Sequence, residues 1–124
     1  MRVLMLTWEY PPNIIGGISR HVDELSRFLV KKGIDVTILT PETLGSPLFE
    51  KVEGVNVFRV QIQVPAPSFH IWIYLMNHFF SKKIGQLIKE GGPFDIVHAH
   101  DWMVVPSATE AKHYTTSKMV LTFH

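Results

Sequence analysis

The loop from Trp8 to Gly17 is the first place in this chain where chemistry is expected. It ends in the pair Gly16-Gly17, directly before a stretch with helical periodicity. Backbone N–H groups point outward at the start of a helix, and the helix dipole favours negative charge there. Glycine also lets a phosphate approach the backbone, because it has no Cβ. The loop therefore predicts an anion site. Two glycines before a helix are common, however, and on this pattern alone a tight turn without a ligand is the preferred interpretation.

The spacing of the glycines argues against two common nucleotide-binding loops. The loop does not contain Gly-x-Gly-x-x-Gly, and it does not end in Gly-Lys-Ser/Thr. We therefore expect neither a simple dinucleotide enzyme nor a nucleoside triphosphatase.

A second group of polar and aromatic residues follows two later strands. His100, Asp101 and Trp102 come after the predicted strand 94–99, and His124 comes after the predicted strand 118–123. A carboxylate beside an aromatic ring suits a sugar, because the carboxylate accepts hydroxyl protons while the ring covers an apolar sugar face. Core packing of Trp102 is an equal alternative.

The histidines near these strand ends also raise a metal hypothesis. His98 and His100 are two residues apart and share one face of an extended strand, with Asp101 and His124 expected nearby. We favour hydrogen bonding to backbone and substrate instead, because spacing does not fix ligand geometry, and we expect His98 to be structural. A carboxylate pair of Glu9 and Asp101 for glycoside hydrolysis is not favoured, because nothing in the sequence sets their separation.

The hydrophobic pattern predicts strands that alternate with helices. The helical stretches are 18–32, 70–90 and 103–114, and the strands are 2–7, 34–40, 52–60, 94–99 and 118–123. A turn signal at Glu53-Gly54 would make the third strand a hairpin. This pattern predicts an α/β fold with a doubly wound, mostly parallel, Rossmann-like sheet. With the strand order 3-2-1-4-5, the glycine loop, His100-Asp101-Trp102 and His124 are expected at one rim, where the order reverses.

Composition limits the class of protein. The chain has 124 residues, of which 46% are hydrophobic and 19% charged, as expected for one globular domain. The net charge of +1 gives no electrostatic case for nucleic acid, and without cysteine there are no disulfides or thiolate metal sites. No signal peptide is visible, and residues 69–80 are too short and too polar to span a membrane. We therefore expect a cytoplasmic protein.

The predicted helix 70–90 is apolar almost all round in its first half. Such a helix is either buried on two sides or docked on another chain. Trp72, Met76 and Phe80 would form the docking face in the second case.

The motifs together resemble a known family. The segment from Val3 to Pro12, followed by Gly16-Gly17-Ile18 and His21-Val22, resembles the opening of glycogen and starch synthases. Residues 95–102 are similar to their Asp-Val-Val-His-x-His-Asp-Trp segment, and residues 120–124 to their Thr-x-His strand end. These enzymes are retaining GT-B glycosyltransferases of families 4 and 5. Three motifs in the same order span the whole chain.

The resemblance implies two α/β domains that face each other across a cleft, with the N-terminal domain mainly binding acceptor. It implies that Gly16, Gly17 and Ile18 bind the donor diphosphate through backbone N–H groups, and that His124 is the catalytic residue beside the transferred sugar. The acceptor-side residues would be Glu9, Tyr10, His100, Asp101 and Trp102. The substrates implied are a nucleotide sugar such as ADP-glucose or UDP-glucose and an oligo- or polysaccharide such as an α-1,4-glucan, with neither a metal nor a cofactor.

Two departures from the family pattern qualify this expectation. Ile14 stands where bacterial glycogen synthases have a lysine that helps to hold the donor phosphates, which favours a broader family 4 enzyme. Residues 1–124 cover only part of the expected N-terminal domain, so we expect a truncated domain, without the donor domain and inactive alone. The alternatives are a non-catalytic carbohydrate- or nucleotide-binding module, and a subunit that pairs with a separate donor-domain chain or as a homodimer.

Overall fold

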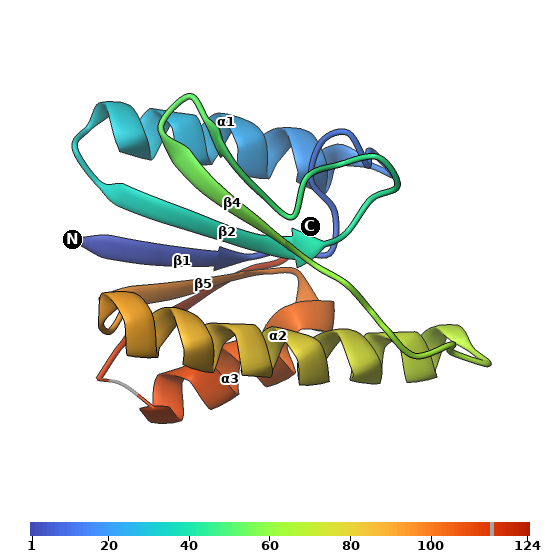
Figure 1. Cartoon of the computed structure of the whole chain (residues 1–124). Coiled ribbons are helices and arrows are strands. Elements are labelled where there is room, and N and C mark those ends of the chain that lie inside the picture. Colours follow the sequence, from blue (N-terminus) through green and yellow to red (C-terminus); the bar gives the residue numbers. More distant parts are fainter. Residues whose placement is uncertain (115) are drawn as a thin grey trace.

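The computed structural model describes residues 1–114 and 116–124, which form a six-stranded sheet between two helical layers (Figure 1). The order of the strands in the sheet is β3-β4-β2-β1-β5-β6. The strands are β1 (Arg2–Leu6), β2 (Asp35–Pro41), β3 (Phe49–Val52), β4 (Val55–Val60), β5 (Ile96–His100) and β6 (Lys118–Thr122). The helices are α1 (Gly17–Lys31), α2 (Phe69–Gly91) and α3 (Val105–Tyr114), with a 3-10 turn η1 (Trp102–Val104) before α3.

Five of the strands are parallel, and the predicted strand order is confirmed. β4, β2, β1, β5 and β6 pair in parallel, whereas β3 pairs antiparallel with β4 at the edge of the sheet. Glu53 and Gly54 form the turn between β3 and β4 with φ values of 49° and 84°. The segment expected as one strand at 52–60 is therefore part of a β3-β4 hairpin, as its turn signal indicated. The predicted doubly wound α/β fold is present, with β3 as an antiparallel strand at one edge.

Each face of the sheet has its own hydrophobic core. β1 divides between them, because successive side chains of a strand point to opposite faces. Val3 and Met5 pack in the core under α1, whereas Leu4 and Leu6 pack in the core under α2 and α3 (Figure 1). Burial on both faces explains why the sequence of β1 is a continuous apolar run.

Helix α2 packs against the sheet on one side and against α3, in the same layer, on another, so burial on two sides is the alternative that is confirmed and Trp72, Met76 and Phe80 form no docking face (Figure 1). Met76 and Phe80 are both 0% exposed and belong to the core, with Trp72 packed against it. Asn77 explains how a polar residue fits this place. Its side-chain amide donates to the carbonyl oxygens of Ile73 and Met103, each at 2.9 Å, and joins α2 to the segment before α3.

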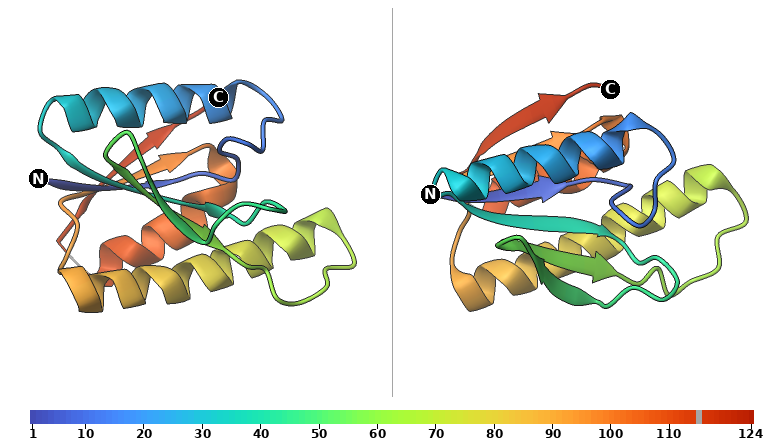
Figure 2. Two further views of the ribbon diagram at one scale, coloured as in Figure 1. Left: turned by 45° about the horizontal axis from the view of Figure 1, so that its top comes forward. Right: turned by 90° about the horizontal axis from the view of Figure 1, so that it is seen from above.

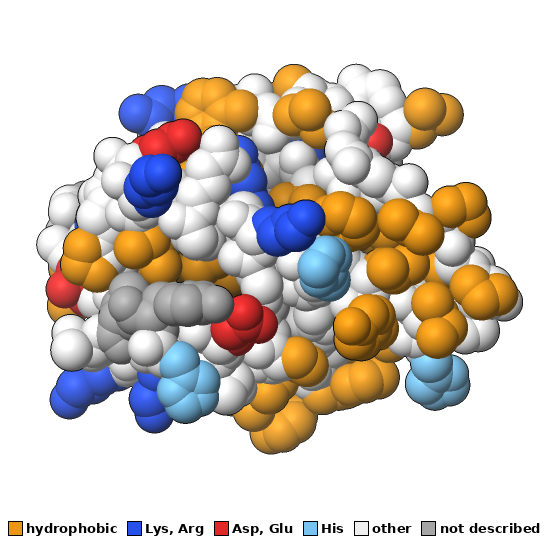
Figure 3. Space-filling model, turned by 60° about the horizontal axis from the view of Figure 1, so that its bottom comes forward, with side chains coloured by type: hydrophobic (Ala, Val, Ile, Leu, Met, Phe, Trp, Pro, Cys, Tyr) orange, Lys and Arg blue, Asp and Glu red, His pale blue; other side chains and the backbone are white. Residues whose placement is uncertain are grey.

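The apolar side chains that α2 does expose lie near its N-terminus. Phe69, Ile71 and Tyr74 are 51%, 43% and 69% exposed, and apolar side chains gather at this end of the molecule in Figure 3, on the right. Across the described residues, no helix combines the length and the hydropathy that crossing a membrane requires.

Candidate functional site

Three segments that are distant in the sequence meet at the carboxyl end of the sheet. β1, β5 and β6 are consecutive in the strand order. The glycine loop follows β1, Asp101 follows β5, and His124 follows β6. Both views in Figure 2 place the end of the chain after β6 close to the start of α1. This is the rim where ligands bind in doubly wound sheets.

A cavity of about 600 Å³ opens at this rim. Its walls come from the glycine loop, the first turns of α1 and the segment that ends β6. The lining residues are Trp8, Glu9, Ile15, Gly16, Gly17, Ile18, His21, Thr122 and His124. The structure thus brings together the predicted donor residues Gly16, Gly17 and Ile18 with the predicted catalytic residue His124.

The carboxylate of Glu9 holds the glycine loop against the start of α1. It accepts hydrogen bonds from the backbone N–H groups of Ser19 at 2.8 Å, Ile15 at 3.1 Å and Gly16 at 3.2 Å. The Glu9 residue is only 1% exposed. A carboxylate at a helix N-terminus satisfies N–H groups that lack helical partners and interacts favourably with the helix dipole. Glu9, predicted on the acceptor side, therefore has a structural task inside the protein.

The N–H groups that donate to Glu9 do not include those of Gly17 and Ile18, which therefore remain available to a ligand. Both residues stand in the first turn of α1, where no preceding carbonyl is available to them. Neither N–H group has a hydrogen-bond partner among the described residues. Both residues line the cavity. The predicted three-residue anion site is therefore reduced to two free N–H groups, because the carboxylate already occupies that of Gly16.

Tyr10, also predicted on the acceptor side, lies inside the protein. It is 3% exposed, and burial raises the pKa of its hydroxyl to about 12. The guanidinium group of Arg59 lies 5.8 Å from the centre of its ring. Arg59 donates to the carbonyl oxygens of Pro11 at 3.0 Å and Pro47 at 3.1 Å, and so ties the loop to the segment before β3. Tyr10 and Arg59 therefore stabilise the conformation of the loop from the interior of the protein.

Asp101 and Trp102 lie at the same rim but do not line the cavity. Asp101 directly follows β5 with a φ of 74°, and its backbone N–H donates to the carbonyl oxygen of Thr122 at 2.8 Å. Trp102 is 53% exposed, so core packing does not account for its position. These two residues remain the predicted acceptor residues that a ligand at the surface can reach.

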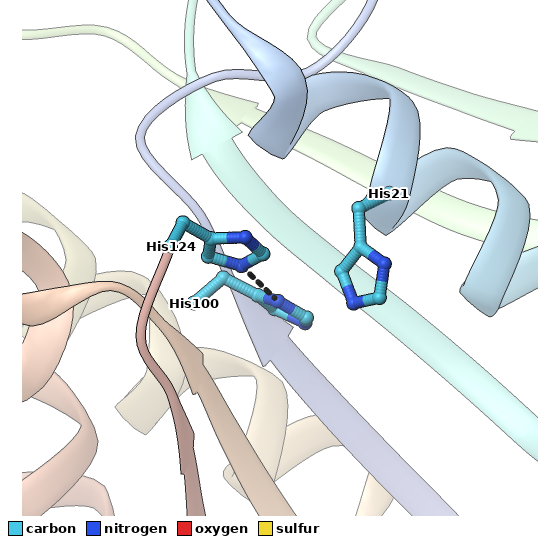
Figure 4. A group of neighbouring side chains, drawn as sticks. All are labelled: His21, His100 and His124. Atoms are coloured by element: carbon cyan, nitrogen blue, oxygen red, sulfur yellow. Dashed lines mark hydrogen bonds between the residues drawn. The ribbon is translucent and has the colours of Figure 1, made fainter.

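Four histidines gather beside the cavity, on the face of the sheet that carries α1. The rings of His98 and His100 stack with their centres 4.0 Å apart. Nε2 of His98 lies 2.7 Å from Oγ1 of Thr122, and Nδ1 of His100 lies 3.4 Å from Nε2 of His124. The ring of His21 lies 5.1 Å from that of His124 (Figure 4). His98 thus has the satisfied structural position that its place in the strand predicted.

Burial keeps two of these rings uncharged. Burial, together with the smaller effects of the neighbouring His98, His124 and His21, lowers the pKa of His100 to about 3. Burial also lowers the pKa of His98 to about 4, again with contributions from His21 and His124. His100, predicted on the acceptor side, is 0% exposed and lies beneath the cavity instead of in its wall.

His21 is the site residue that sequence reasoning did not assign. It is exposed, lines the cavity and faces His124. A signal was present in the sequence, because residues 17, 18 and 21 are three or four positions apart and share one face of a helix. Together the cavity offers two backbone donors and two exposed imidazoles, a set suited to an anion and to sugar hydroxyl groups.

Glu9→Gln should destabilise the protein strongly. The substitution replaces one accepting oxygen by an NH2 group, which would face backbone donors without an acceptor. We expect the free energy of unfolding to fall by about 2 to 4 kcal/mol, as for hydrogen bonds to a buried charged group. Urea unfolding followed by circular dichroism measures this. Glu24→Gln, an exposed change of the same kind on α1, is the control, and an equal effect of both substitutions would contradict the role of Glu9.

The buried histidines predict that stability falls as the pH falls. The unfolded chain takes up protons near pH 6.5, whereas the pKa values of about 4 for His98 and about 3 for His100 keep the folded state unprotonated to lower pH. Below about pH 6.5 the unfolded state binds more protons, so the free energy of unfolding decreases. Between pH 7 and pH 5 the expected loss is on the order of 2 kcal/mol for each histidine.

Urea unfolding at several pH values measures this loss. His100→Gln should remove roughly half of the pH dependence that the two residues cause, while His70→Gln, an exposed change on α2, should leave it intact. A free energy of unfolding that stays constant from pH 7 to pH 5 would contradict the burial of these rings.

Comparison with known proteins agrees with this geometry. The family model described as Glycosyltransferase Family 4 matches residues 15–124. An uncharacterized glycosyltransferase of Methanocaldococcus jannaschii is 36% identical over 124 residues, which is the whole of this chain and 31% of that protein. A glycogen synthase of Mycobacterium tuberculosis is 36% identical over 138 residues, which cover this chain fully and 33% of the synthase. The chain therefore spans about a third of the length of these relatives.

Solved structures share the fold. A sucrose-phosphate synthase from Thermosynechococcus elongatus superposes with a TM-score of 0.82 at 15% identity, over 99% of this chain and 33% of that one. The catalytic domain of starch synthase IV from Arabidopsis thaliana, solved with ADP and acarbose, gives a TM-score of 0.71 at 20% identity, over 99% of this chain and 34% of that one. The chain belongs to glycosyltransferase family 4, and its sheet is the Rossmann-like fold of the N-terminal part of a GT-B glycosyltransferase.

Proposed function

We propose that these residues are the acceptor-side part of a retaining glycosyltransferase that transfers glucose from ADP-glucose or UDP-glucose to a glucan. The observation that carries the proposal is the cavity in which two free backbone N–H groups, those of Gly17 and Ile18, lie together with His21 and His124. N–H groups at a helix start suit the donor diphosphate. Imidazoles beside them suit the hydroxyl groups of the transferred sugar, as the resemblance implies for His124.

The acceptor would approach past Asp101 and Trp102. These residues follow the neighbouring strand, β5, and Trp102 exposes its ring to solvent. The starch synthase of similar fold was solved with acarbose, a carbohydrate, and a glycogen synthase is among the relatives. We infer an α-1,4-glucan acceptor from these likenesses.

The charge of the diphosphate needs a partner that the cavity does not contain. None of the described residues that line it is lysine or arginine, and Ile14 stands where bacterial glycogen synthases have a lysine. Departure of a diphosphate leaving group requires its charge to be stabilised. We therefore propose that residues 1–124 alone bind a sugar nucleotide weakly and transfer no sugar, and that the cationic groups belong to a donor domain.

The lack of a cation also favours a second candidate function. A binding module that recognises a carbohydrate or nucleotide without turning it over needs no stabilised leaving group. The two candidates share the cavity but differ in the need for a donor domain. Glucosyl transfer after the addition of a separate donor domain would support the enzyme, whereas saturable glucan binding without any transfer would support the module.

Gly17→Ala tests the phosphate site without disturbing the fold. A Cβ built at Gly17 meets no atom within 4 Å, and alanine is the better helix former. The substitution should therefore leave the free energy of unfolding unchanged or slightly higher. It should raise the Kd for UDP-glucose or ADP-glucose at least about tenfold, a loss of about 1.4 kcal/mol, because the methyl group stands where the phosphate approaches.

Isothermal titration calorimetry of the 124-residue chain measures this affinity. Gly85→Ala is the matched control, since a Cβ there also meets nothing within 4 Å and the residue lies in α2, away from the cavity. Equal nucleotide-sugar affinity of the Gly17→Ala and Gly85→Ala variants would overturn the assignment of the diphosphate to this loop.

A further inference from the structure

The ring of His100 lies beneath the cavity and contacts the ring of His124, which lines it (Figure 4). The proposed function gives a role to His124 but none to His100. Nδ1 of His100 lies 3.4 Å from Nε2 of His124. We propose that His100 is a positioning residue, whose Nδ1–H group donates to Nε2 of His124 and so fixes both the tautomer and the orientation of the His124 ring.

The contact between the two rings needs one proton between its two nitrogens. A neutral imidazole has one N–H donor and one accepting nitrogen. Two arrangements satisfy this: either His100 donates from Nδ1, or His124 donates from Nε2. They differ in the state of the other nitrogen of His100, Nε2. The surroundings of that nitrogen therefore decide between the two arrangements.

Nε2 of His100 is buried and has no hydrogen-bond partner among the described residues. If His124 donated, the proton of His100 would be on Nε2, as a buried N–H group without an acceptor. If His100 donates from Nδ1, its Nε2 carries only a lone pair. Among buried backbone groups, an N–H without an acceptor is rarer than an acceptor that lacks a donor, and we apply the same rule to this ring. His100 is therefore the donor.

The ring of His100 is neutral and held in place. Burial is the main cause that lowers its pKa to about 3, so a state with both nitrogens protonated is not populated near neutral pH. The ring of His98 stacks on it with the centres 4.0 Å apart, which restricts its rotation. His98 is fixed in turn, because its Nε2 lies 2.7 Å from Oγ1 of Thr122. A fixed neutral ring can donate in only one direction.

Donation by His100 assigns the proton of neutral His124 to Nδ1, because Nε2 is then the acceptor. Nδ1 lies on the side of the ring away from His100 (Figure 4). Since His100 lies beneath the cavity, His124 offers an N–H donor to a ligand above it, not a lone pair. We expect this donor to bind a hydroxyl oxygen of the transferred sugar. Only this last step rests on the proposed function.

NMR of the histidine side chains in the ¹⁵N-labelled 124-residue chain tests the tautomers directly. The measurement is made at about pH 8, above the ordinary pKa of imidazole. Long-range ¹H–¹⁵N spectra distinguish protonated from unprotonated ring nitrogens. We expect a protonated Nδ1 and an unprotonated Nε2 in both His100 and His124, with a ¹⁵N–¹⁵N coupling across the hydrogen bond. A protonated Nε2 in either ring would overturn the proposal.

Two substitutions of His100 separate the hydrogen bond from a merely structural role. The side-chain NH2 group of asparagine can occupy the place of Nδ1 of a histidine, whereas that of glutamine lies closer to the place of Nε2. His100→Asn should therefore keep the proton of His124 on Nδ1, whereas His100→Gln should give a mixture of both tautomers. His70→Gln, an exposed change on α2, is the control and should leave the His124 spectrum unchanged.

An identical His124 tautomer in the His100→Gln variant and the unchanged chain would contradict the role of His100. If the glutamine variant does not fold, the spectrum of the unchanged chain still decides.

Binding measurements separate this inference from the proposed function. His100→Gln should raise the Kd for UDP-glucose or ADP-glucose about two- to tenfold, the effect of one hydrogen bond, and leave the Kd for UDP or ADP unchanged. The expected tautomers without this selective loss would uphold the positioning of His124 by His100 and refute its contact with the sugar. The selective loss with a protonated Nε2 in His100 would support the sugar site and refute the positioning role.

Discussion

The carboxylate of Glu9 is the interaction on which the site depends. Glu9 follows β1, and its carboxylate accepts hydrogen bonds from three backbone N–H groups further along the loop, those of Ile15, Gly16 and Ser19. Tyr10 and Arg59 constrain the first half of the loop, and Glu9 constrains the second half, where the two glycines lie. The carboxylate also selects which donors remain. It accepts from two N–H groups that precede α1 and from that of Ser19 in the first turn, so the N–H groups of Gly17 and Ile18 remain unpaired beside the cavity.

This arrangement has an electrostatic cost that the rest of the site must offset. A buried carboxylate close to a proposed anion site repels the anion, and no lysine or arginine lines the cavity among the described residues. The helix dipole and two N–H groups favour a phosphate but do not neutralise its charge. The two imidazoles that line the cavity, those of His21 and His124, are exposed, and burial keeps those of His98 and His100 uncharged beneath it. Weak binding of a sugar nucleotide by these residues, with cations supplied from elsewhere, is consistent with this balance.

Much of the fold was predictable because the signals are local. The apolar run of β1, the helical stripe of α1 and the glycine turn between β3 and β4 each follow from a few neighbouring residues. The strand order was also predictable, since parallel crossovers allow few arrangements. The gathering of the glycine loop and His124 at one rim followed from that order and not from any single motif.

The roles of individual polar side chains were not predictable in the same way. Glu9 accepts from N–H groups six to ten residues further along the chain. No local sequence pattern predicts the path of the loop that brings these groups back to Glu9. Met76 and Phe80 were ambiguous for a related reason: an apolar helix surface does not reveal whether α3 or another chain covers it. Even His21, on the same helical face as Gly17 and Ile18, stood out only after β6 was seen to end beside α1.

The most direct test of the central claim is a titration of ¹⁵N-labelled protein with UDP, followed by the amide resonances of residues 15 to 19. We expect saturable shifts of the Gly17 and Ile18 amides, and smaller shifts of the Ile15, Gly16 and Ser19 amides, which already donate to Glu9. Saturable UDP binding that leaves the Gly17 and Ile18 resonances unmoved would contradict it.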